Sequence, residues 1–434
     1  MSRKIFHILF LKTVVSKWIR WRFNLLTFLF GSLILSCEIN ETIDPELGRS
    51  FVKFYGGIKQ QQGFDIKQTA DGGYILFGST TSFGNGGSDM YLVKVDRLGN
   101  EVWSNTYGGG FNDVGRSIQI VPGGGYALLG DYERVQDSTD MYFVRVDVNG
   151  AVLFERRFNN SSTNSNEQGF EIQNTLDGGF ILVGSTTKTD GIKNAPVDFY
   201  LVKTDNAGIL EWERTRGFEG TTEIGRSIVQ IDENSYIISG TTESRRDLSQ
   251  EGTNIFVYKI NANGDELGTN FFGGLGNEEG HSITKMGATF LIVGTTGSGI
   301  GNGGGGQDAL LINMDANLNE IFSESYGGPE DEWGLSVQQL SDGGFIIAGS
   351  TTSFREGASD KDYYMVRTDP GGRELDEWRL TPRIFGGKGN DEASAVVQTA
   401  DGGFALFGTS TFFESTNNTV LCLIKTNPKG ELLP

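Results

Sequence analysis

Acidic side chains return at one position of this 434-residue sequence at intervals of 54 to 59 residues, two residues before a Gly or, in the last case, before Ala393. They are Asp113, Glu167, Glu223, Glu278, Glu332 and Asp391, with Gln61 at the first position of the series. Two carboxylates about 5–10 Å apart can cleave a glycosidic bond, and a ring of oxygen ligands suits calcium. We favour a plainer interpretation, in which each acid accepts amide hydrogen bonds from its own stretch of backbone.

A second position, directly after each Gly or Ala393, changes identity from one copy to the next. It is occupied by Phe64, Arg116, Phe170, Arg226, His281, Leu335 and Ser394. Aromatic, guanidinium and imidazole groups in one ring would stack on a sugar or hold an anionic group. Two interpretations stay open, because a one-residue shift in register decides whether these side chains face a shared space or pack between neighbouring units.

A third series places a base two residues before an Asp or Asn. Its members are Lys94, Arg145, Lys203, Lys259, Arg367 and Lys425, with Asn313 as the exception. Five of the copies also carry an acid five residues before this position, namely Asp89, Asp140, Asp198, Asp308 and Asp362. Because the pattern recurs in nearly every copy, we expect charge pairing that supports the structure and not a single active site.

Other kinds of chemistry find little support. After residue 37 the chain has one histidine, His281, and one further cysteine, Cys422, so disulfide frameworks, Cys/His metal sites and His- or Cys-based triads are disfavoured. The glycine run Gly303 to Gly306 lacks the Lys of a phosphate-binding loop. The formal net charge of −19 and the isoelectric point near 4.6 argue against a nucleic-acid partner.

These positions are embedded in a repeated phrase, read as DGGYILFG, GGGYALLG, DGGFILVG, DGGFIIAG and DGGFALFG, with two weaker copies ending at Gly240 and Gly294. The aromatic residues that anchor the seven copies are Tyr74, Tyr126, Phe180, Tyr236, Phe290, Phe345 and Phe404. A fixed period of this length is typical of repeat architectures, in which neighbouring units share one continuous core.

Each unit is expected to contain four short strands, which the first copy illustrates with Phe64–Gln68, Tyr74–Ser79, Met90–Asp96 and Trp103–Tyr107. Glycines of the turn 71–73 can adopt the positive φ of a tight hairpin. Hairpins repeated at this period predict an all-β fold, a seven-bladed β-propeller of four-stranded antiparallel blades.

The two ends of the repeat region complement each other. The last unit stops where its fourth strand would begin, and FVKFYGG (51–57) matches WSNTYGG (103–109). We therefore expect the N-terminal strand to complete the last blade, which removes two open sheet edges.

The phrases DGG-aromatic, G-x-T-x-S, K-x-D and W-x-x-x-YGG resemble those of a bacterial secreted β-propeller repeat family, distantly similar to kelch repeats. The resemblance covers residues 51–434 and implies the propeller fold. Secreted members are often surface or envelope proteins without an assigned reaction, and propellers in general host unrelated functions.

The first 36 residues carry bases, no acid, and an apolar run from Phe23 to Ser36, which predicts a secretory leader. Ile34 to Cys37 resemble a lipobox, so residues 1–36 are expected to be a lipoprotein signal peptide and Cys37 a lipidated anchor to the membrane. Residues 37–50 would form an acidic, flexible tether, and residues 51–434 the propeller. We expect an outer-membrane lipoprotein; whether it faces the periplasm or the cell surface stays open.

In a four-stranded blade, the connection from strand two to strand three and the crossover to the next blade lie on the same face. Here that face carries diverse loops, whereas the opposite face carries uniform Asp-Gly-Gly and Asp-x-x-Gly turns. A rigid frame with variable loops predicts a binding surface. The expected function is a monomeric, noncatalytic envelope scaffold for a glycan, peptide or envelope protein, without a cofactor apart from the calcium considered above. The alternative is an endoglucanase-like carbohydrate-active hydrolase that uses paired carboxylates near the channel mouth.

Overall fold

The computed structural model describes residues 49–159, 165–188, 196–218, 220–243, 252–299, 304–354, 360–411 and 418–433. The expected signal peptide, Cys37 and almost all of the tether lie outside these ranges, as do parts of several connections on the variable face. In the described part of the chain, no helix is long and apolar enough to cross a bilayer.

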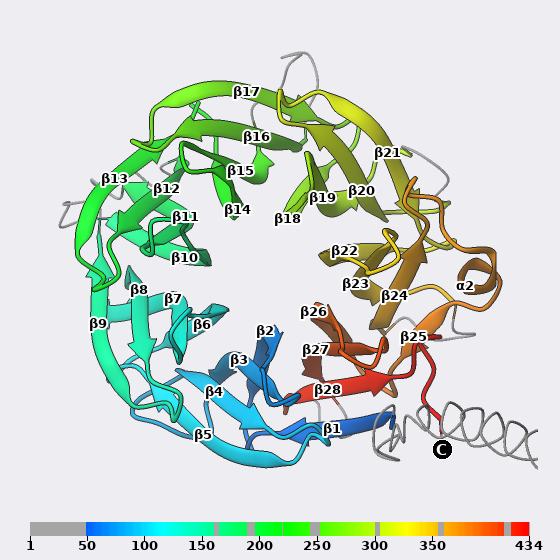
Figure 1. The fold of residues 1–434 in the computed structure, drawn as a ribbon, viewed down its shortest axis with the longest axis horizontal. Coiled ribbons are helices and arrows are strands. Elements are labelled where there is room, and N and C mark those ends of the chain that lie inside the picture. The colour runs from blue at the N-terminus through cyan, green and yellow to red at the C-terminus, as the bar shows by residue number, and fades with distance from the viewer. Residues whose placement is uncertain are drawn as a thin grey trace, which may run out of the picture. The chain divides into compact units, whose positions relative to one another are not determined.

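The described strands form seven four-stranded antiparallel sheets arranged as a ring, so the prediction of a seven-bladed β-propeller is confirmed (Figure 1). Blade 1 consists of β2 (Gln61–Gln68), β3 (Tyr74–Thr80), β4 (Asp89–Val95) and β5 (Glu101–Tyr107), and blade 2 of β6 (Asp113–Ile120), β7 (Tyr126–Val135), β8 (Ser138–Val146) and β9 (Val152–Phe158). Blade 3 consists of β10 (Ser165–Asn174), β11 (Phe180–Lys188), β12 (Val197–Thr204) and β13 (Leu210–Arg216), and blade 4 of β14 (Glu223–Asp232), β15 (Ser235–Thr242), β16 (Asn254–Asn261) and β17 (Glu266–Phe272). Blade 5 consists of β18 (Glu278–Met286), β19 (Thr289–Thr296), β20 (Asp308–Asp315) and β21 (Glu320–Tyr326), and blade 6 of β22 (Glu332–Gln339), β23 (Phe345–Thr351), β24 (Asp362–Thr368) and β25 (Arg383–Phe385). Blade 7 consists of β26 (Asp391–Gln398), β27 (Phe404–Ser410), β28 (Val420–Thr426) and β1 (Phe51–Tyr55).

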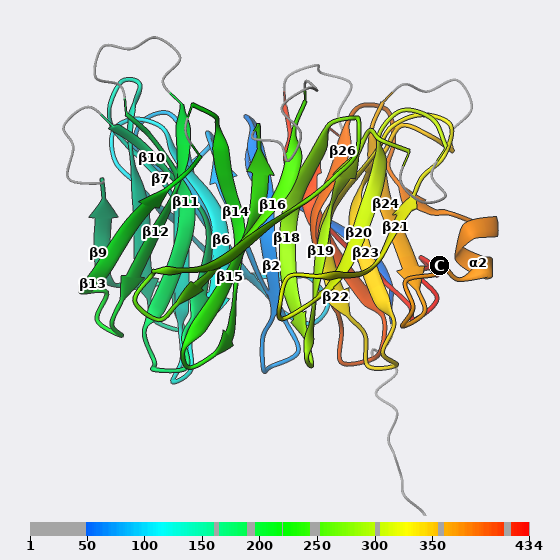
Figure 2. The ribbon, with the colours of Figure 1, turned by 90° about the horizontal axis from the view of Figure 1, so that it is seen from above.

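Within each blade the first strand lies nearest the centre of the ring and the fourth at the rim (Figure 1). Seen from the side, the strands run between the two faces of the ring, so the connections make up those faces (Figure 2). The first strand of each blade therefore starts at the crossover face and ends at the face of the Asp-Gly-Gly turns.

The N-terminal strand closes the ring as predicted. β1 is the outermost strand of blade 7 and pairs antiparallel with β28, from Phe51 opposite Lys425 to Tyr55 opposite Leu421. Tyr55 is buried and packs in a cluster that also contains Leu421 and residues of blade 1. Its hydroxyl donates a hydrogen bond to the carbonyl of Gly99 at 2.8 Å, which ties blade 7 to the turn between β4 and β5 of blade 1.

The core is divided among the contacts between blades. The buried apolar side chains of the described residues fall into seven clusters, and each cluster draws its members from two adjacent blades. The second and third strands supply most of them, because both faces of these strands are covered by neighbouring blades.

Blade 6 departs from the predicted pattern at the rim. Its fourth strand, β25, has only three residues, and the helix α2 (Asp376–Leu380) precedes it. Trp378 of this helix is fully buried and meets the ring of Phe404 edge-on, with centroids 5.9 Å apart. The extra residues of the longest repeat interval thus form a small cap that replaces part of a strand.

Tyr55→Ala should lower the free energy of unfolding by about 3–5 kcal/mol, because it leaves a cavity where an aromatic side chain joins two blades. Val52→Ala on the same strand should change it by less than about 0.5 kcal/mol, because Val52 is 39% exposed. Chemical denaturation of both variants measures the difference, and equal effects would contradict the closure described here.

Candidate functional site

A β-bulge occurs at the same place in all seven blades. The register between the first and second strands shifts by one residue directly after Gly63, Gly115, Gly169, Gly225, Gly280, Gly334 and Ala393. The residue left without a partner in each case is the variable one: Phe64, Arg116, Phe170, Arg226, His281, Leu335 and Ser394. A bulge redirects the side chain that it leaves unpaired.

All seven of these side chains line one central cavity of about 340 Å³. The sequence left open whether they face a shared space or pack between blades, and the structure places them around the shared space. Phe64 is the fourth residue of β2, which starts at the crossover face. At about 3.3 Å per residue, the ring of variable side chains lies roughly 10 Å below that face.

The ring is chemically uneven, because a cation–aromatic arc runs through blades 1 to 4. The guanidinium of Arg116 lies 5.7 Å from the ring centroid of Phe64 and 5.0 Å from that of Phe170, and Arg226 lies 4.8 Å from Phe170 on its other side in the ring order. Each guanidinium thus rests against an aromatic face, an attractive contact. His281, Leu335 and Ser394 complete the circle with an imidazole, an apolar and a hydroxyl group.

Arg116 and Arg226 differ in their polar contacts. Arg116 donates from Nε and Nη2 to Oδ2 of Asp131, at 3.1 and 2.8 Å. Arg226 has no hydrogen-bond acceptor among the described residues, and its Nε is buried. Burial, and then the charge of Arg116, lowers the pKa of Arg226, which nevertheless stays protonated because guanidinium is so basic.

His281 is the one other basic group among the seven variable residues. Burial, followed by the positive charge of Arg226, lowers the pKa of His281 to about 3. The imidazole is therefore neutral throughout the physiological range. Its Nε2 lies 3.7 Å from Oε2 of Glu279, and the described residues give it no hydrogen-bond partner.

Two carboxylates, Asp65 and Glu171, are among the residues that line the described cavity, and both are engaged in joining blades. Asp65 accepts the backbone N–H of Ile118 in blade 2 at 3.0 Å, and Glu171 accepts that of Ile228 in blade 4 at 2.9 Å. Ser227 fills the same role between blades 4 and 5. These bonds satisfy amides close to the bulges, which would otherwise be buried without acceptors.

The crossover acids lie at or near the starts of the first strands. Asp113, Glu167, Glu223, Glu278, Glu332 and Asp391 are at most 2% exposed, and none is among the described residues that line the cavity. Five of them accept N–H groups of their crossovers, in line with the interpretation favoured from the sequence: Asp113 accepts the N–H of Gly109 at 2.5 Å, and Glu332 that of Gly328 at 2.6 Å. Glu167 accepts a hydrogen bond from the hydroxyl of Thr186 at 2.8 Å.

Most of these acids face a second carboxylate across the blade junction. Asp308 of β20 and Glu332 of β22 approach each other over Gly327, where any Cβ would collide with their oxygens. One oxygen of Asp308 is buried without a hydrogen-bond partner among the described residues. Burial and the charges of Glu332 and Asp331 raise the pKa of Asp308 to about 6.

The junction between blades 1 and 2 repeats this arrangement, since burial and the charge of Asp113 raise the pKa of Asp89 to about 6. The junction between blades 4 and 5 provides a natural comparison. There Asn254 takes the place of the first acid and lies beside Glu278. In the described part of the chain no group of three or more His, Cys, Asp or Glu side chains is arranged to hold a metal ion, so calcium at the channel mouth gains no support.

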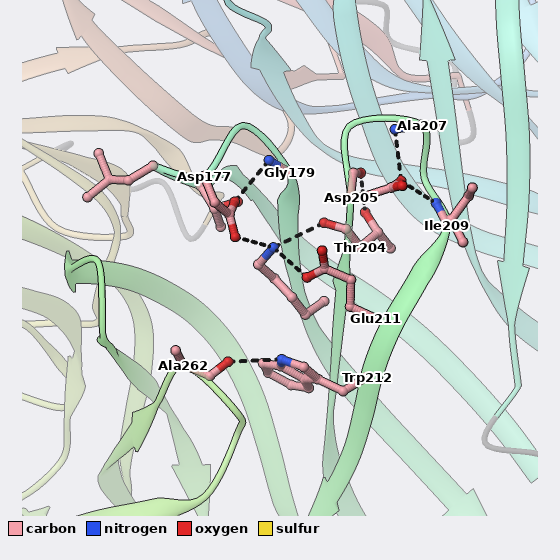
Figure 3. A network of polar contacts seen from close by, with 12 residues as sticks. Asp177, Gly179, Thr204, Asp205, Ala207, Ile209, Glu211, Trp212 and Ala262 are labelled. Atoms are coloured by element: carbon pink, nitrogen blue, oxygen red, sulfur yellow. Dashed lines mark hydrogen bonds and ion pairs between the residues drawn. The ribbon is translucent and has the colours of Figure 1, made fainter.

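Four of the six bases of the third strands pair with acids of the Asp-Gly-Gly turns, namely Lys94, Lys203, Arg367 and Lys425. Arg145 and Lys259 donate to backbone carbonyls. Lys203 is buried and binds Asp177 at 2.8 Å and Glu211 at 3.0 Å (Figure 3). Lys94 and Lys425 make the equivalent contacts to Asp71 and Asp401. Burial alone would raise the pKa of Asp177, but hydrogen bonds from Lys203, Thr175 and Gly179 outweigh it and hold that pKa at about 2. The series is structural, as expected, although its partners differ from the nearest acids in sequence.

Sequence reasoning missed Asp131. At this position, directly after the second-strand Gly, the other blades carry a hydroxyl: Ser79, Ser185, Thr241, Thr295, Ser350 and Thr409. A lone acid in a series of six hydroxyl residues was the available signal. That Asp131 pairs with Arg116 could be recognised only from the register between β6 and β7.

No protein-family model and no curated protein matches the sequence. Solved structures with a similar fold include a protein of unknown function from Bacteroides caccae, 13% identical over 75% of this chain and 97% of that chain with a TM-score of 0.41. They also include the periplasmic gluconolactonase of Pseudomonas aeruginosa, 12% identical over 79% and 87% with a TM-score of 0.45. The alpha-L-arabinanase of Penicillium chrysogenum is 11% identical over 72% and 92%, with a TM-score of 0.43. At such identities the likeness concerns the fold alone.

Asp89→Asn should raise the free energy of unfolding by about 1–3 kcal/mol at pH 8 and leave it nearly unchanged at pH 4. The raised pKa means that the folded protein binds more protons than the unfolded chain between about pH 4 and pH 6, so native stability falls as pH rises through that window. The neutral amide removes this loss.

The reverse change, Asn254→Asp, is the matched control and should destabilise the protein at pH 8 but not at pH 4. Urea unfolding at both pH values measures the two variants. A stabilisation by Asp89→Asn that is the same at pH 4 and pH 8 would contradict the repulsion between the paired carboxylates.

Proposed function

We propose that this protein is a noncatalytic binding scaffold of the bacterial cell envelope, which holds a glycan, peptide or envelope protein at the central cavity and the variable face above it. The observation that supports this most is the ring of bulges, which presents five kinds of side chain from seven equivalent backbone positions. Elsewhere in each blade, the recurring residues have recurring structural contacts. Variation at cavity-lining positions, together with the diverse loops of the crossover face, is the pattern of a recognition surface on a rigid frame.

The contacts of the carboxylates favour binding over hydrolysis. A glycosidase needs two acids that reach a substrate from an open pocket. The crossover acids are buried, and Asp65 and Glu171 of the cavity are held by amides, hydroxyls and Lys67. No specific contact therefore favours the endoglucanase-like alternative.

The envelope assignment is a proposal from the sequence. A lipid on Cys37 would attach the protein to the outer membrane, and residues 38–50 would hold the propeller away from the lipid surface. We further propose that the propeller acts as a monomer, because ring closure pairs the edges of its first and last repeats within one chain.

The lipid anchor is tested by Cys37→Ser expressed in a Gram-negative host. Wild-type protein should incorporate labelled palmitate and sediment with the outer membrane, whereas the variant should do neither, because serine provides no thiol for acylation. Palmitate incorporation that is equal in both proteins would contradict the lipobox interpretation.

Ligand binding is tested with the soluble protein, residues 38–434, on a glycan and peptide library. The double variant Arg116→Ala/Arg226→Ala should weaken binding at least about tenfold, since two cationic contacts of the cavity are lost. The matched control is Arg156→Ala/Arg214→Ala, which removes two rim arginines that also lie against aromatic rings, Phe154 and Trp212. Equal loss in both double variants, or unchanged binding in the cavity variant, would refute the cavity as the site.

A further inference from the structure

Arg116 and Arg226 occupy equivalent bulges, but only the blade of Arg116 provides a carboxylate partner. In blade 2, Asp131 performs two tasks. Its Oδ1 accepts the N–H of Gly169 in the next blade at 3.0 Å, and its Oδ2 accepts the two hydrogen bonds of Arg116. The carboxylate thus neutralises the guanidinium beside it.

In blade 4 the position of Asp131 is held by Thr241. The Oγ1 of Thr241 accepts the N–H of Gly280 in the next blade at 3.2 Å, so the first task is preserved. The second is not, because a hydroxyl carries no negative charge. Arg226 is left half-buried against Phe170 without an acceptor among the described residues.

The surroundings of Arg226 do not compensate for this. Glu279 attracts the guanidinium electrostatically, but its side chain is 46% exposed and makes no hydrogen bond to Arg226. His281, in the adjacent blade, is neutral. Because a partly buried cation without a hydrogen-bonded partner is costly, the cavity holds one positive charge that an incoming group can stabilise.

We infer that Arg226 is a subsite for the carboxylate of an acidic sugar residue, which takes at Arg226 the place that Asp131 takes at Arg116. This inference rests on the proposed function, because it assumes that the cavity receives the ligand. A planar carboxylate matches the fork of a guanidinium, and a single unpaired cation calls for a monoanion. A phosphate dianion would bring one negative charge more than Arg226 can neutralise.

The remaining lining fits a hydroxylated ligand of small size. Gln119, Gln173, Ser282, Thr284 and Gln338 bring amide and hydroxyl groups to the same cavity. Such groups exchange hydrogen bonds with sugar hydroxyls as donors and as acceptors. A volume of about 340 Å³ lies at the lower end of the range for ligand sites, roughly 300–1,000 Å³, which suits one terminal sugar residue and not a long chain.

The experiment compares galacturonate with galactose, two sugars of similar size that differ by the carboxylate at C6. Isothermal titration calorimetry with wild-type protein should give at least about tenfold tighter binding of galacturonate. Thr241→Asp should abolish this preference, because the new side chain supplies Arg226 with an internal carboxylate and repels that of the ligand. Thr241→Asn is the matched control, similar in shape to Asp but uncharged, and should keep the preference.

A second variant keeps the inference testable if Thr241→Asp fails to fold. Arg226→Gln removes the charge but keeps a polar side chain of similar length, and it should bind the two sugars equally.

The inference is overturned if wild-type protein binds galactose as tightly as galacturonate, or does not bind galacturonate, or if both Thr241→Asp and Arg226→Gln keep the preference. Binding of a peptide with a free C-terminus in place of galacturonate would also overturn it, in favour of a peptide ligand. In each case the library measurement with the double arginine variant reports separately on the proposed function, because it does not depend on an acidic sugar.

Discussion

Among the described residues, no blade has a hydrophobic core of its own, and the rest of the structure follows from that. Each described cluster of buried apolar side chains is assembled from two neighbours, including the one that joins blade 7 to blade 1. A blade at an open end would expose half of a core together with a sheet edge, so the array is stable only as a closed ring. The pairing of β1 with β28 joins the first and last segments of the propeller and thereby removes both exposed ends.

Ring closure also makes most positions similar from blade to blade, because every junction between blades needs the same set of polar contacts. The crossover amides need a buried acceptor, the Asp-Gly-Gly turn needs a cation, and the amide beside the bulge needs an acceptor from the preceding blade. The unpaired residue of the bulge has none of these duties. The backbone fixes its direction but not its chemistry, which explains how a phenylalanine, an arginine and a histidine occupy equivalent places.

The sequence alone was sufficient for the blades and the closure, because both depend on local phrases and on the match between 51–57 and 103–109. It was insufficient wherever a result depends on register. The direction of the Phe64 side chain and of its equivalents is set by a β-bulge, and the sequence shows no sign of that bulge besides the preceding Gly. The crossover acids were recognised from the sequence as a series of amide acceptors, which agrees with the contacts of Asp113 and Glu332. The second carboxylate that most of them face, such as Asp308 beside Glu332, comes from another blade and could be found only from the packing of two blades. The helix α2 was not anticipated, since its residues replace part of a strand in blade 6 only.

The charge of the whole chain bears on how the cavity can recognise a ligand. With a net charge of −19, the protein repels anions at long range, so electrostatic steering does not favour an acidic ligand. At physiological ionic strength such surface charges are screened beyond about 8 Å, whereas a guanidinium in a partly buried cavity is screened much less. Recognition of an anion here must therefore come from contact with Arg226 itself. A site of this kind gains little in association rate and most in the lifetime of the complex, because its attraction acts only after the ligand has entered. The same acidic surface would repel polyanions too large for the cavity, so the proposed site would favour a ligand with a single charged residue at the end of a chain.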